Sequence, residues 1–246
     1  MSLNAPRPIF LTAEWRNLAI LNFTADPGIL QPYVPAGTEF DLFHRLALIS
    51  LVGFQFQKTR IKGVAIPFHR DFEEINLRFY VKRRHGGELR RGVVFVKEIV
   101  PKAAIAWVAR TLYGENYVAL PMRHDVVSGT KAEYSCHAQG RWNHMRIQAI
   151  GEPGLPAVGS LEHFIIEHYW GYARQQGGGT MEYKVEHPSW RVWPVKSAEI
   201  EWDTAGMYGN DLASALSAPV HSAVLAEGSA VIVRSGARLL NQERSL

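Results

Sequence analysis

The sequence has 246 residues, of which 47% are hydrophobic and 20% are charged, and its formal net charge is +4. This is the composition of an ordinary globular protein, and the length without internal repeats favours a single domain over residues 1–246. The one cysteine, Cys136, excludes an internal disulfide. Because the sequence shows neither a signal peptide nor the roughly 20-residue apolar run of a membrane helix, we expect a cytoplasmic protein.

The basic residues do not predict a nucleic-acid partner. Their densest cluster runs from Lys82 to Arg91 around His85-Gly86-Gly87, which is typical of a hairpin turn exposed to solvent. A nucleic-acid interface would need a broader basic face and a recognisable motif. We therefore expect a small-molecule ligand, no nucleic acid and no membrane as partners, and we leave a homo-oligomer open.

The first quarter of the chain predicts strands separated by one short helix. Asp26 is expected to cap a helix that begins at Pro27 and ends at 35–37. The stretches with strand character are Glu14–Thr24, Phe40–Phe43 and Leu46–Phe56. Gly53, inside the last of these, indicates a bulge or a bend.

The central stretch, residues 72–104, predicts a hairpin followed by the start of a helix. Glu74–Arg84 alternates between apolar and polar residues. Its apolar face carries Ile75, Leu77, Phe79 and Val81, and its other face carries Glu74, Asn76, Arg78, Tyr80 and Lys82. The return strand, Arg91–Val100, is mostly apolar on both faces, so we expect it to be buried on both sides or to line a barrel. Glu98 on that strand must find a partner or change its protonation state.

The rest of the chain predicts more strands than helices. One helix is expected from Ala103 to a C-cap at Gly114, and another from a cap at Ser160 to Ala173. The remaining predicted elements are the strands Thr130–Gln139, Arg141–Ile150, Met181–Glu186, Val195–Trp202, Val220–Ala226 and Ala230–Arg234, and the short helix Asp211–Leu216. Because the strands follow one another in hairpins, we predict a mainly β fold: an antiparallel sheet or barrel with several packed helices.

Lys102 is the candidate nucleophile. It lies between an apolar strand and an apolar helix, where burial would lower the pKa of its amine and make it reactive. The alternative is a structural ion pair or an exposed lysine, since Glu74 or Glu98 nearby would keep the ammonium charged. Glu74 has an alternative of its own, as the ion-pair partner of Arg78 or Arg16.

Other catalytic patterns are weak. His163 and Glu167 share a helix face, but this spacing alone is not specific, and the other histidines have no spacing that predicts a metal site. The sequence has no P-loop and no GxSxG motif, and the glycines at 177–179 lack the flanking elements of a dinucleotide fingerprint. We therefore predict neither a metal nor a cofactor, and keep a metal hydrolase as a weaker alternative.

Three segments resemble acetoacetate decarboxylase-like proteins. They are WRNLAILNFTADPGILQPYVPAG (15–37), FEEINLRFYV (72–81) and VKEIVPK (96–102). Two further segments, GSLEHFIIEHYWGYA (159–173) and EHPSWRVWP (186–194), are similar to a bacterial branch of that superfamily, the YqjF-like proteins. The resemblance covers roughly residues 10–235 and implies a cone-like antiparallel β-barrel with packed helices.

The resemblance also implies a site. Arg16, Glu74 and Lys102 fall at the positions of the family's arginine, pocket glutamate and reactive lysine. Such a lysine attacks a ketone to form an imine, which requires its pKa to fall from about 10.4 toward neutrality. One departure is Ala103, which stands where the decarboxylases have a second lysine.

Two functions follow from this resemblance. The first is a Schiff-base lyase acting on a small oxo-acid, with Lys102 as nucleophile, Glu74 positioning substrate or protons, and Arg16 anchoring a carboxylate or orienting Glu74. Glu98 and Arg78 are its candidate substrate-binding residues. The second, favoured by Ala103, is a non-catalytic protein that binds a small molecule in the barrel pocket.

Overall fold

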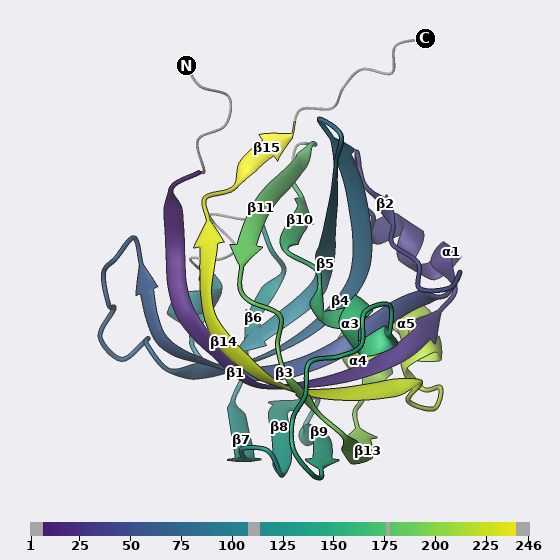
Figure 1. Ribbon diagram of the computed structural model, residues 1–246. Helices are drawn as coiled ribbons and strands as arrows, with labels where there is room; N and C mark the ends of the chain where they lie inside the picture. Colours follow the sequence, from purple (N-terminus) through teal and green to yellow (C-terminus); the bar gives the residue numbers. More distant parts are fainter. Residues whose placement is uncertain (1–6, 108–113, 176–177, 240–246) are drawn as a thin grey trace.

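The fold is organised around one large sheet that closes on itself. The computed structural model describes residues 7–107, 114–175 and 178–239, and its strands enclose a cone-like space (Figure 1). The strands of the ring are β1 (Ile9–Ala25), β3 (Ala47–Ile61), β4 (Phe72–His85), β5 (Glu88–Val100), β10 (Trp170–Arg174), β11 (Thr180–Glu186) and β14 (Ser222–Arg234). They are joined in the order β14-β1-β3-β4-β5-β10-β11, and β11 pairs back to β14 through Val185 and Val233.

Within the described residues, all ladders of this sheet are antiparallel except two. β5 pairs in parallel with β10 and with β6 (Tyr117–Ala119). Short strands extend the ring at its edges: β2 (Glu39–Phe40) on β4, β12 (Val192–Trp193) on β14 and β15 (Ala237–Leu239) on β11. The predicted mainly antiparallel, cone-like barrel is therefore confirmed.

A second, smaller sheet packs below the cone in Figure 1. It contains β7 (Met122–Val127), β8 (Lys131–Ala138), β9 (Arg141–Ala149) and β13 (Val195–Glu201), in the order β13-β9-β8-β7. The hairpin predicted around Gly140 is β8–β9 of this sheet. The ring of Tyr134 in β8 lies against the backbone of Gly53, where an added Cβ would meet the ring at 2.5 Å. Gly53 is therefore needed for this close approach, and a register shift in the β1–β3 ladder lies beside it.

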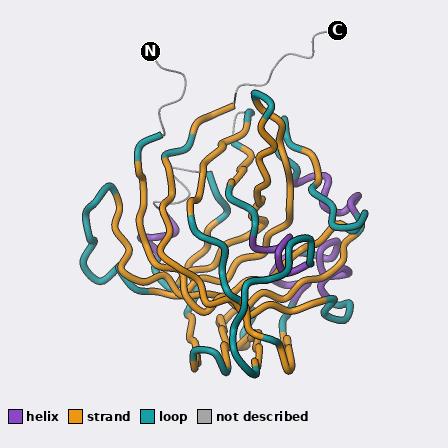
Figure 2. Tube along the Cα trace, viewed as in Figure 1, coloured by secondary structure: helices purple, strands orange, loops and turns teal. Residues whose placement is uncertain are grey.

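Helices are few and short (Figure 2). Those described are α1 (Pro27–Leu30), the 3₁₀ turn Gln31–Tyr33, the turn at residues 103–107, α3 (Leu161–Ile166), α4 (Thr204–Tyr208) and α5 (Asn210–Leu216). Asp26 caps α1 by accepting a bond from the Gly28 amide, and Ser160 caps α3 through the His163 amide, as predicted. None of the described helices has the length and apolar character needed to cross a membrane.

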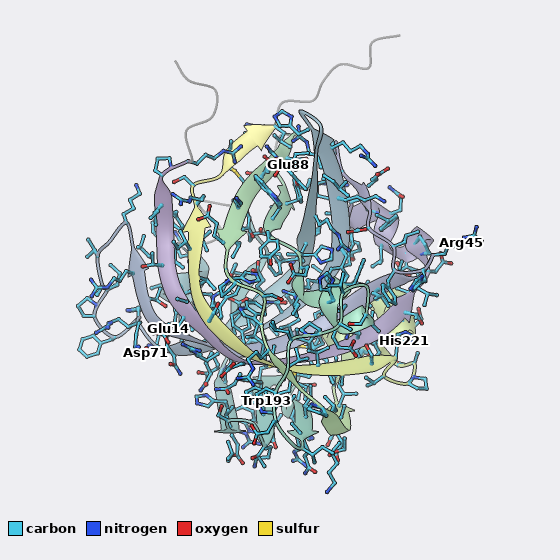
Figure 3. All side chains as sticks on the ribbon, viewed as in Figure 1. Glu14, Arg45, Asp71, Glu88, Trp193 and His221 are labelled. Carbon is cyan, nitrogen blue, oxygen red and sulfur yellow. The ribbon has the colours of Figure 1, made fainter. Side chains whose placement is uncertain are left out.

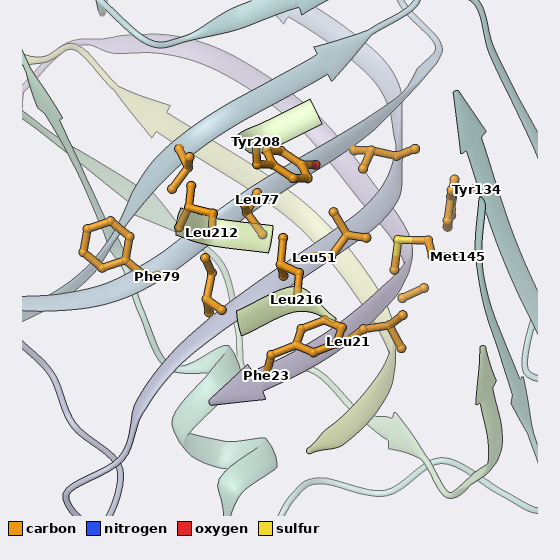
Figure 4. Packing of buried hydrophobic residues seen from close by; sticks show 14 of the residues in the cluster. Leu21, Phe23, Leu51, Leu77, Phe79, Tyr134, Met145, Tyr208, Leu212 and Leu216 are labelled. Atoms are coloured by element: carbon orange, nitrogen blue, oxygen red, sulfur yellow. The ribbon is translucent and has the colours of Figure 1, made fainter. Parts of the chain in front are cut away.

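Apolar side chains pack on both faces of the ring. The outer-face cluster joins alternate residues of β1, β3 and β4 to the small sheet and to α5, as Leu77 and Phe79 with Leu212 and Leu216 illustrate (Figure 4). The inner-face cluster includes Val52, Phe54 and Tyr80 of the ring with Phe164 and Ile165 of α3. The ring is therefore a wall with a core on each side.

Four details differ from the sequence predictions. The return strand does not alternate strictly, because Leu77 pairs with Lys97 while Arg78 pairs with Phe95, which leaves Val96 as an extra bulge residue. The helix expected to reach Ala173 ends at Ile166, and the strand β10 follows it. The two last predicted strands are one strand, β14, with Gly228 at φ +79 opposite Arg16.

The fourth detail concerns the helix expected from Ala103 to Gly114. Residues 103–107 are helical and Gly114 has the positive φ expected of a C-cap residue, whereas residues 108–113 lie outside the described part of the chain. α4 was not predicted from the sequence.

Candidate functional site

A cavity of about 230 Å³ lies against the inner face of the ring. Its lining is mostly apolar and aromatic, and comes from the ring strands, from β6 and α3, and from the loops between them. The aromatic lining residues are Phe10, Trp15, Phe54, Phe56, Phe72, Phe95, Trp170 and Trp190, with the tyrosines Tyr117 and Tyr183. Such an apolar chamber with a few polar side chains is the usual form of a small-molecule site.

The bulge at Val96 determines which side chains of β5 reach this cavity. Phe95 and Glu98 both line it, although strict alternation would place residues three apart on opposite faces. The extra residue reverses the alternation, so that Glu98 joins Glu74, Asn76 and Arg78 of the neighbouring strand β4. Bulges of this kind commonly redirect a side chain toward a site.

Three buried carboxyl groups line the cavity, Glu74, Glu98 and Glu115. Burial raises the pKa of Glu74 to about 7, although bonds from Asn76 and Tyr117 and the charge of Arg78 oppose it. Burial likewise raises the pKa of Glu115 to about 8. Burial, with the neighbouring carboxylates of Glu115 and Glu74, raises the pKa of Glu98 well above its ordinary value. Near pH 7 this cluster is therefore largely protonated.

Two tyrosines and an amide hold these carboxyl groups in place. The Tyr117 hydroxyl donates to Glu74 Oε2 at 2.9 Å, and Asn76 Nδ2 donates to Glu74 Oε1 at 2.9 Å. The Tyr183 hydroxyl donates to Glu115 Oε1 at 2.9 Å. Glu98 Oε2 is buried and has no hydrogen-bond partner among the described residues.

Arg78 is the cationic side chain of the cavity. The residue is only 9% exposed, and its guanidinium carbon lies 5.8 Å from the centre of the Tyr80 ring. Its Nε has no hydrogen-bond partner, and among the described residues no carboxylate oxygen lies within 4.0 Å of its nitrogens. A buried guanidinium without such a partner is costly, so it favours an anionic ligand.

His168 adds a buried imidazole to the cavity wall. Its side chain is 1% exposed, and Nε2 lies 3.2 Å from Oδ2 of Asp41, which also accepts a 2.6 Å bond from Nε of Arg91. The ring of His168 lies 4.7 Å from that of Tyr80 and 5.0 Å from that of Phe164. Burial lowers the pKa of His168 to about 4, against the raising effect of Asp41. The imidazole is therefore neutral at pH 7.

The structure does not place Lys102 in the cavity wall. Its ammonium donates to the carbonyl oxygen of Phe68, and the side chain is partly exposed. Ala104 and Ile105, on the same helical turn, do line the cavity, so Lys102 lies at its rim. Among the described residues, the amine bonds to neither Glu74 nor Glu98.

Arg16 also lies away from the cavity. Its Nε and Nη2 donate to Glu14 Oε2 at 3.1 and 2.8 Å, and its Nη1 donates to the carbonyl of Gly228 at 3.4 Å. Figure 3 labels Glu14 on the flank of the sheet, near Asp71; both residues bond to Lys58. Of the predicted site residues, the structure thus brings together Glu74, Glu98 and Arg78, and leaves Lys102 and Arg16 outside.

Sequence reasoning missed Glu115, Tyr117 and His168. Glu115 and Tyr117 follow Gly114 in the short segment that adds β6 to β5, and their alternation is the one local signal. His168 lies within the stretch predicted to be helical from Ser160 to Ala173, but α3 ends two residues before it. Among the described residues, no group of three or more histidine, cysteine, aspartate or glutamate side chains is arranged to hold a metal ion.

Comparisons with known proteins agree with this architecture. Residues 12–230 match the family DUF2071, described as "Uncharacterized conserved protein (COG2071)". A search of curated proteins gives no match.

Solved structures extend the comparison to nearly the whole chain. The enduracididine biosynthesis enzyme MppR complexed with pyruvate is 12% identical, with a TM-score of 0.66 and coverage of 98% of this chain and 94% of that one. The acetoacetate decarboxylase from Legionella pneumophila subsp. pneumophila str. Philadelphia 1 is 11% identical, with a TM-score of 0.62 over 98% and 91%. An acetoacetate decarboxylase-like enzyme from Sphingomonas wittichii RW1 is 14% identical, with a TM-score of 0.58 over 95% and 94%. At these identities the likeness establishes the fold.

Proposed function

Because this chain belongs to the DUF2071 family and has the acetoacetate decarboxylase-like fold, we propose that it binds a small, mainly apolar carboxylic acid. The carboxylate of the ligand pairs with Arg78, and the rest of the ligand fills the aromatic chamber. The single observation that carries this proposal is Arg78 itself: a buried guanidinium that lines an apolar cavity without an ion-pair partner among the described residues.

The charge state of the acid cluster supports an anionic ligand. If all three cavity carboxyl groups were ionised, they would repel an anionic ligand. Burial raises the pKa of Glu74 to about 7 and that of Glu115 to about 8, and raises that of Glu98 as well. The protonated groups do not repel an anion, and each can donate a hydrogen bond to it.

A solved structure with the same fold supports a carboxylate ligand. MppR has been crystallised with pyruvate, which is itself a small carboxylate. This shows that a member of the fold accepts such a molecule, and the chemistry of the wall makes the same class suitable here. Arginine is the side chain best suited to a carboxylate, because its planar fork can donate two parallel bonds.

A binding experiment tests the proposal. Isothermal titration calorimetry of the purified chain at pH 7 should show saturable binding of phenylacetate. The uncharged amide phenylacetamide should show no such binding. Arg78→Met should weaken phenylacetate binding by about tenfold to a hundredfold, the range expected for loss of a charge-assisted bond. Arg16→Met is the matched control, since it removes an arginine that lies outside the cavity, and should leave binding unchanged.

A Schiff-base lyase acting on a small oxo-acid is the second candidate. The observation that favours it is the position of Lys102 at the rim, two and three residues before the lining residues Ala104 and Ile105. Borohydride reduction in the presence of pyruvate, read by mass spectrometry, should then give an adduct that Lys102→Ala abolishes. If no adduct forms while phenylacetate still binds through Arg78, the binding function stands without the lyase.

A further inference from the structure

We infer that His168 is a second recognition point in the cavity. Its Nδ1 accepts a hydrogen bond from a hydroxyl group of the bound acid, so hydroxy acids are preferred over oxo acids. This inference rests on the proposed function, because it takes the ligand carboxylate to lie on Arg78. It adds the chemical class of the group beside that carboxylate.

The tautomer of His168 follows from its contact with Asp41. The Asp41 carboxyl is ionised, because burial would raise its pKa but the bonds from His168 and Arg91 lower it below its ordinary value. An ionised carboxylate only accepts hydrogen bonds, so the 3.2 Å contact requires Nε2 of His168 to carry the hydrogen. In the neutral ring Nδ1 is then a bare acceptor.

Nδ1 has no acceptor role elsewhere in the described structure. It is buried and lacks a hydrogen-bond partner, while the residue lines the cavity and its side chain is 1% exposed. Tyr80 and Phe164 pack against the ring, and Asp41 holds its other nitrogen. These contacts fix the ring plane, so the acceptor is presented in one orientation rather than by a mobile side chain.

Arg78 and His168 both line the cavity and both lie beside the ring of Tyr80. The guanidinium carbon of Arg78 lies 5.8 Å from the centre of the Tyr80 ring, and the His168 ring lies 4.7 Å from the same centre. Arg78 is also close enough to contribute to lowering the pKa of His168. The wall therefore offers one cationic donor and one neutral acceptor, both beside the ring of Tyr80.

This pairing distinguishes two classes of acid. The hydroxyl of a 2-hydroxy acid can donate to Nδ1 while the adjacent carboxylate contacts Arg78. The carbonyl oxygen of a 2-oxo acid offers only lone pairs, which would face the lone pair of Nδ1. A site built to bond a hydroxyl discriminates against analogues that lack it, because its own polar group is then left unpaired.

The test compares four ligands of similar size in the unmodified protein. Mandelate carries the hydroxyl, phenylacetate lacks it, phenylglyoxylate replaces it by a carbonyl, and 2-methoxy-2-phenylacetate, the O-methyl ether of mandelate, has no hydroxyl hydrogen. Calorimetry at pH 7 should show mandelate binding about threefold to tenfold more tightly than each of the other three, the range for one neutral hydrogen bond. Equal affinities for mandelate and phenylacetate would overturn the inference.

Variants separate this inference from the function on which it rests. His168→Phe keeps the aromatic packing and should make mandelate and phenylacetate bind equally, whereas Arg78→Met should weaken both by the same factor. If the four acids bind through Arg78 without a preference for mandelate, His168 has no such role while the proposed function stands. If none binds, both are wrong. Thermal unfolding of His168→Phe establishes that it is folded, and the comparison of ligands in the unmodified protein is decisive if it is not.

Discussion

The two faces of β4 are equally buried but differ in chemistry. Every residue from Phe72 to Val81 is buried. The outer face places Ile75, Leu77, Phe79 and Val81 in the cluster shared with the small sheet, whereas the inner face places Glu74, Asn76 and Arg78 in the cavity wall. One strand therefore supplies a core and a site from the same ten residues.

Burial alone therefore does not identify a core residue. Leu77 stabilises the fold through the contacts it makes, while Arg78 beside it is buried without an ion pair among the described residues. A buried polar group without a partner detracts from stability, so its presence needs a reason outside folding. Substitutions on the two faces should separate stability from binding.

The largest effect is expected from the outer face. Leu77→Ala removes a fully buried side chain from the larger core cluster and should lower the free energy of unfolding by about 2–5 kcal/mol. Arg78→Met, on the adjacent residue, should leave the free energy of unfolding unchanged or raise it. Urea denaturation of the two variants measures both. A loss of stability for Arg78→Met as large as that for Leu77→Ala would contradict the distinction between the faces.

The second effect is a dependence of stability on pH that comes from the inner face. The folded Glu115 carboxyl keeps its proton up to about pH 8, whereas its ordinary value is 4.5. Between these values the folded state binds more protons than the unfolded state, so the free energy of unfolding falls as pH rises. The contribution of Glu115 is fully present below about pH 4.5 and is lost through pH 8. We expect a change of several kcal/mol across this range, since each unit of pKa difference corresponds to roughly 1.4 kcal/mol.

Glu115→Gln provides the check on this pH effect. A neutral amide cannot ionise, so the variant should show a flatter curve of unfolding free energy against pH and should be more stable than the unmodified chain at pH 8.5. Urea denaturation at pH 5, 7 and 8.5 measures the slope. Parallel curves for the two proteins would show that Glu115 does not cause the pH dependence. Leu77→Ala is the control, because it should shift the curve without changing its slope.

The third effect concerns how closely the small sheet approaches the ring. Gly53→Ala would place a Cβ 2.5 Å from the Tyr134 ring, and we expect it to lower the free energy of unfolding by about 1–3 kcal/mol. Gly63→Ala cannot serve as a control for this clash, because Gly63 has φ +81 and alanine would be strained there by its backbone alone. Combining Gly53→Ala with Tyr134→Ala should recover much of the loss attributable to the clash. An additive double variant would contradict this contact.

Much of the ring could be predicted from the sequence because its strands alternate regularly. The alternation of β4 places Glu74 and Arg78 on the face opposite Leu77, and the structure agrees. The bulge at Val96 could not be predicted, since alternation assumes one residue per pleat. Glu98, a candidate substrate-binding residue from the sequence, reaches the cavity because of that bulge, which the alternating pattern does not contain.

The missed residues depend on pairings between distant segments. Tyr117 reaches Glu74 because β6 adds to β5, and His168 reaches Asp41 because the chain after α3 turns into β10. Both arrangements depend on parallel pairings with β5, by β6 in one case and by β10 in the other. The second was obscured by a helical pattern that stops at Ile166.

The smallest expected effect is that of Lys102. Its amine bonds to the Phe68 carbonyl at a partly exposed position, so Lys102→Met should change the free energy of unfolding by about 0.5 kcal/mol or less. Phenylacetate affinity should stay within about twofold, because the amine contributes no atom to the cavity wall. Calorimetry alongside Arg78→Met makes the comparison direct. A tenfold loss of affinity in Lys102→Met would mean that the amine turns inward when a ligand binds, and the lyase would then be favoured over the binding protein.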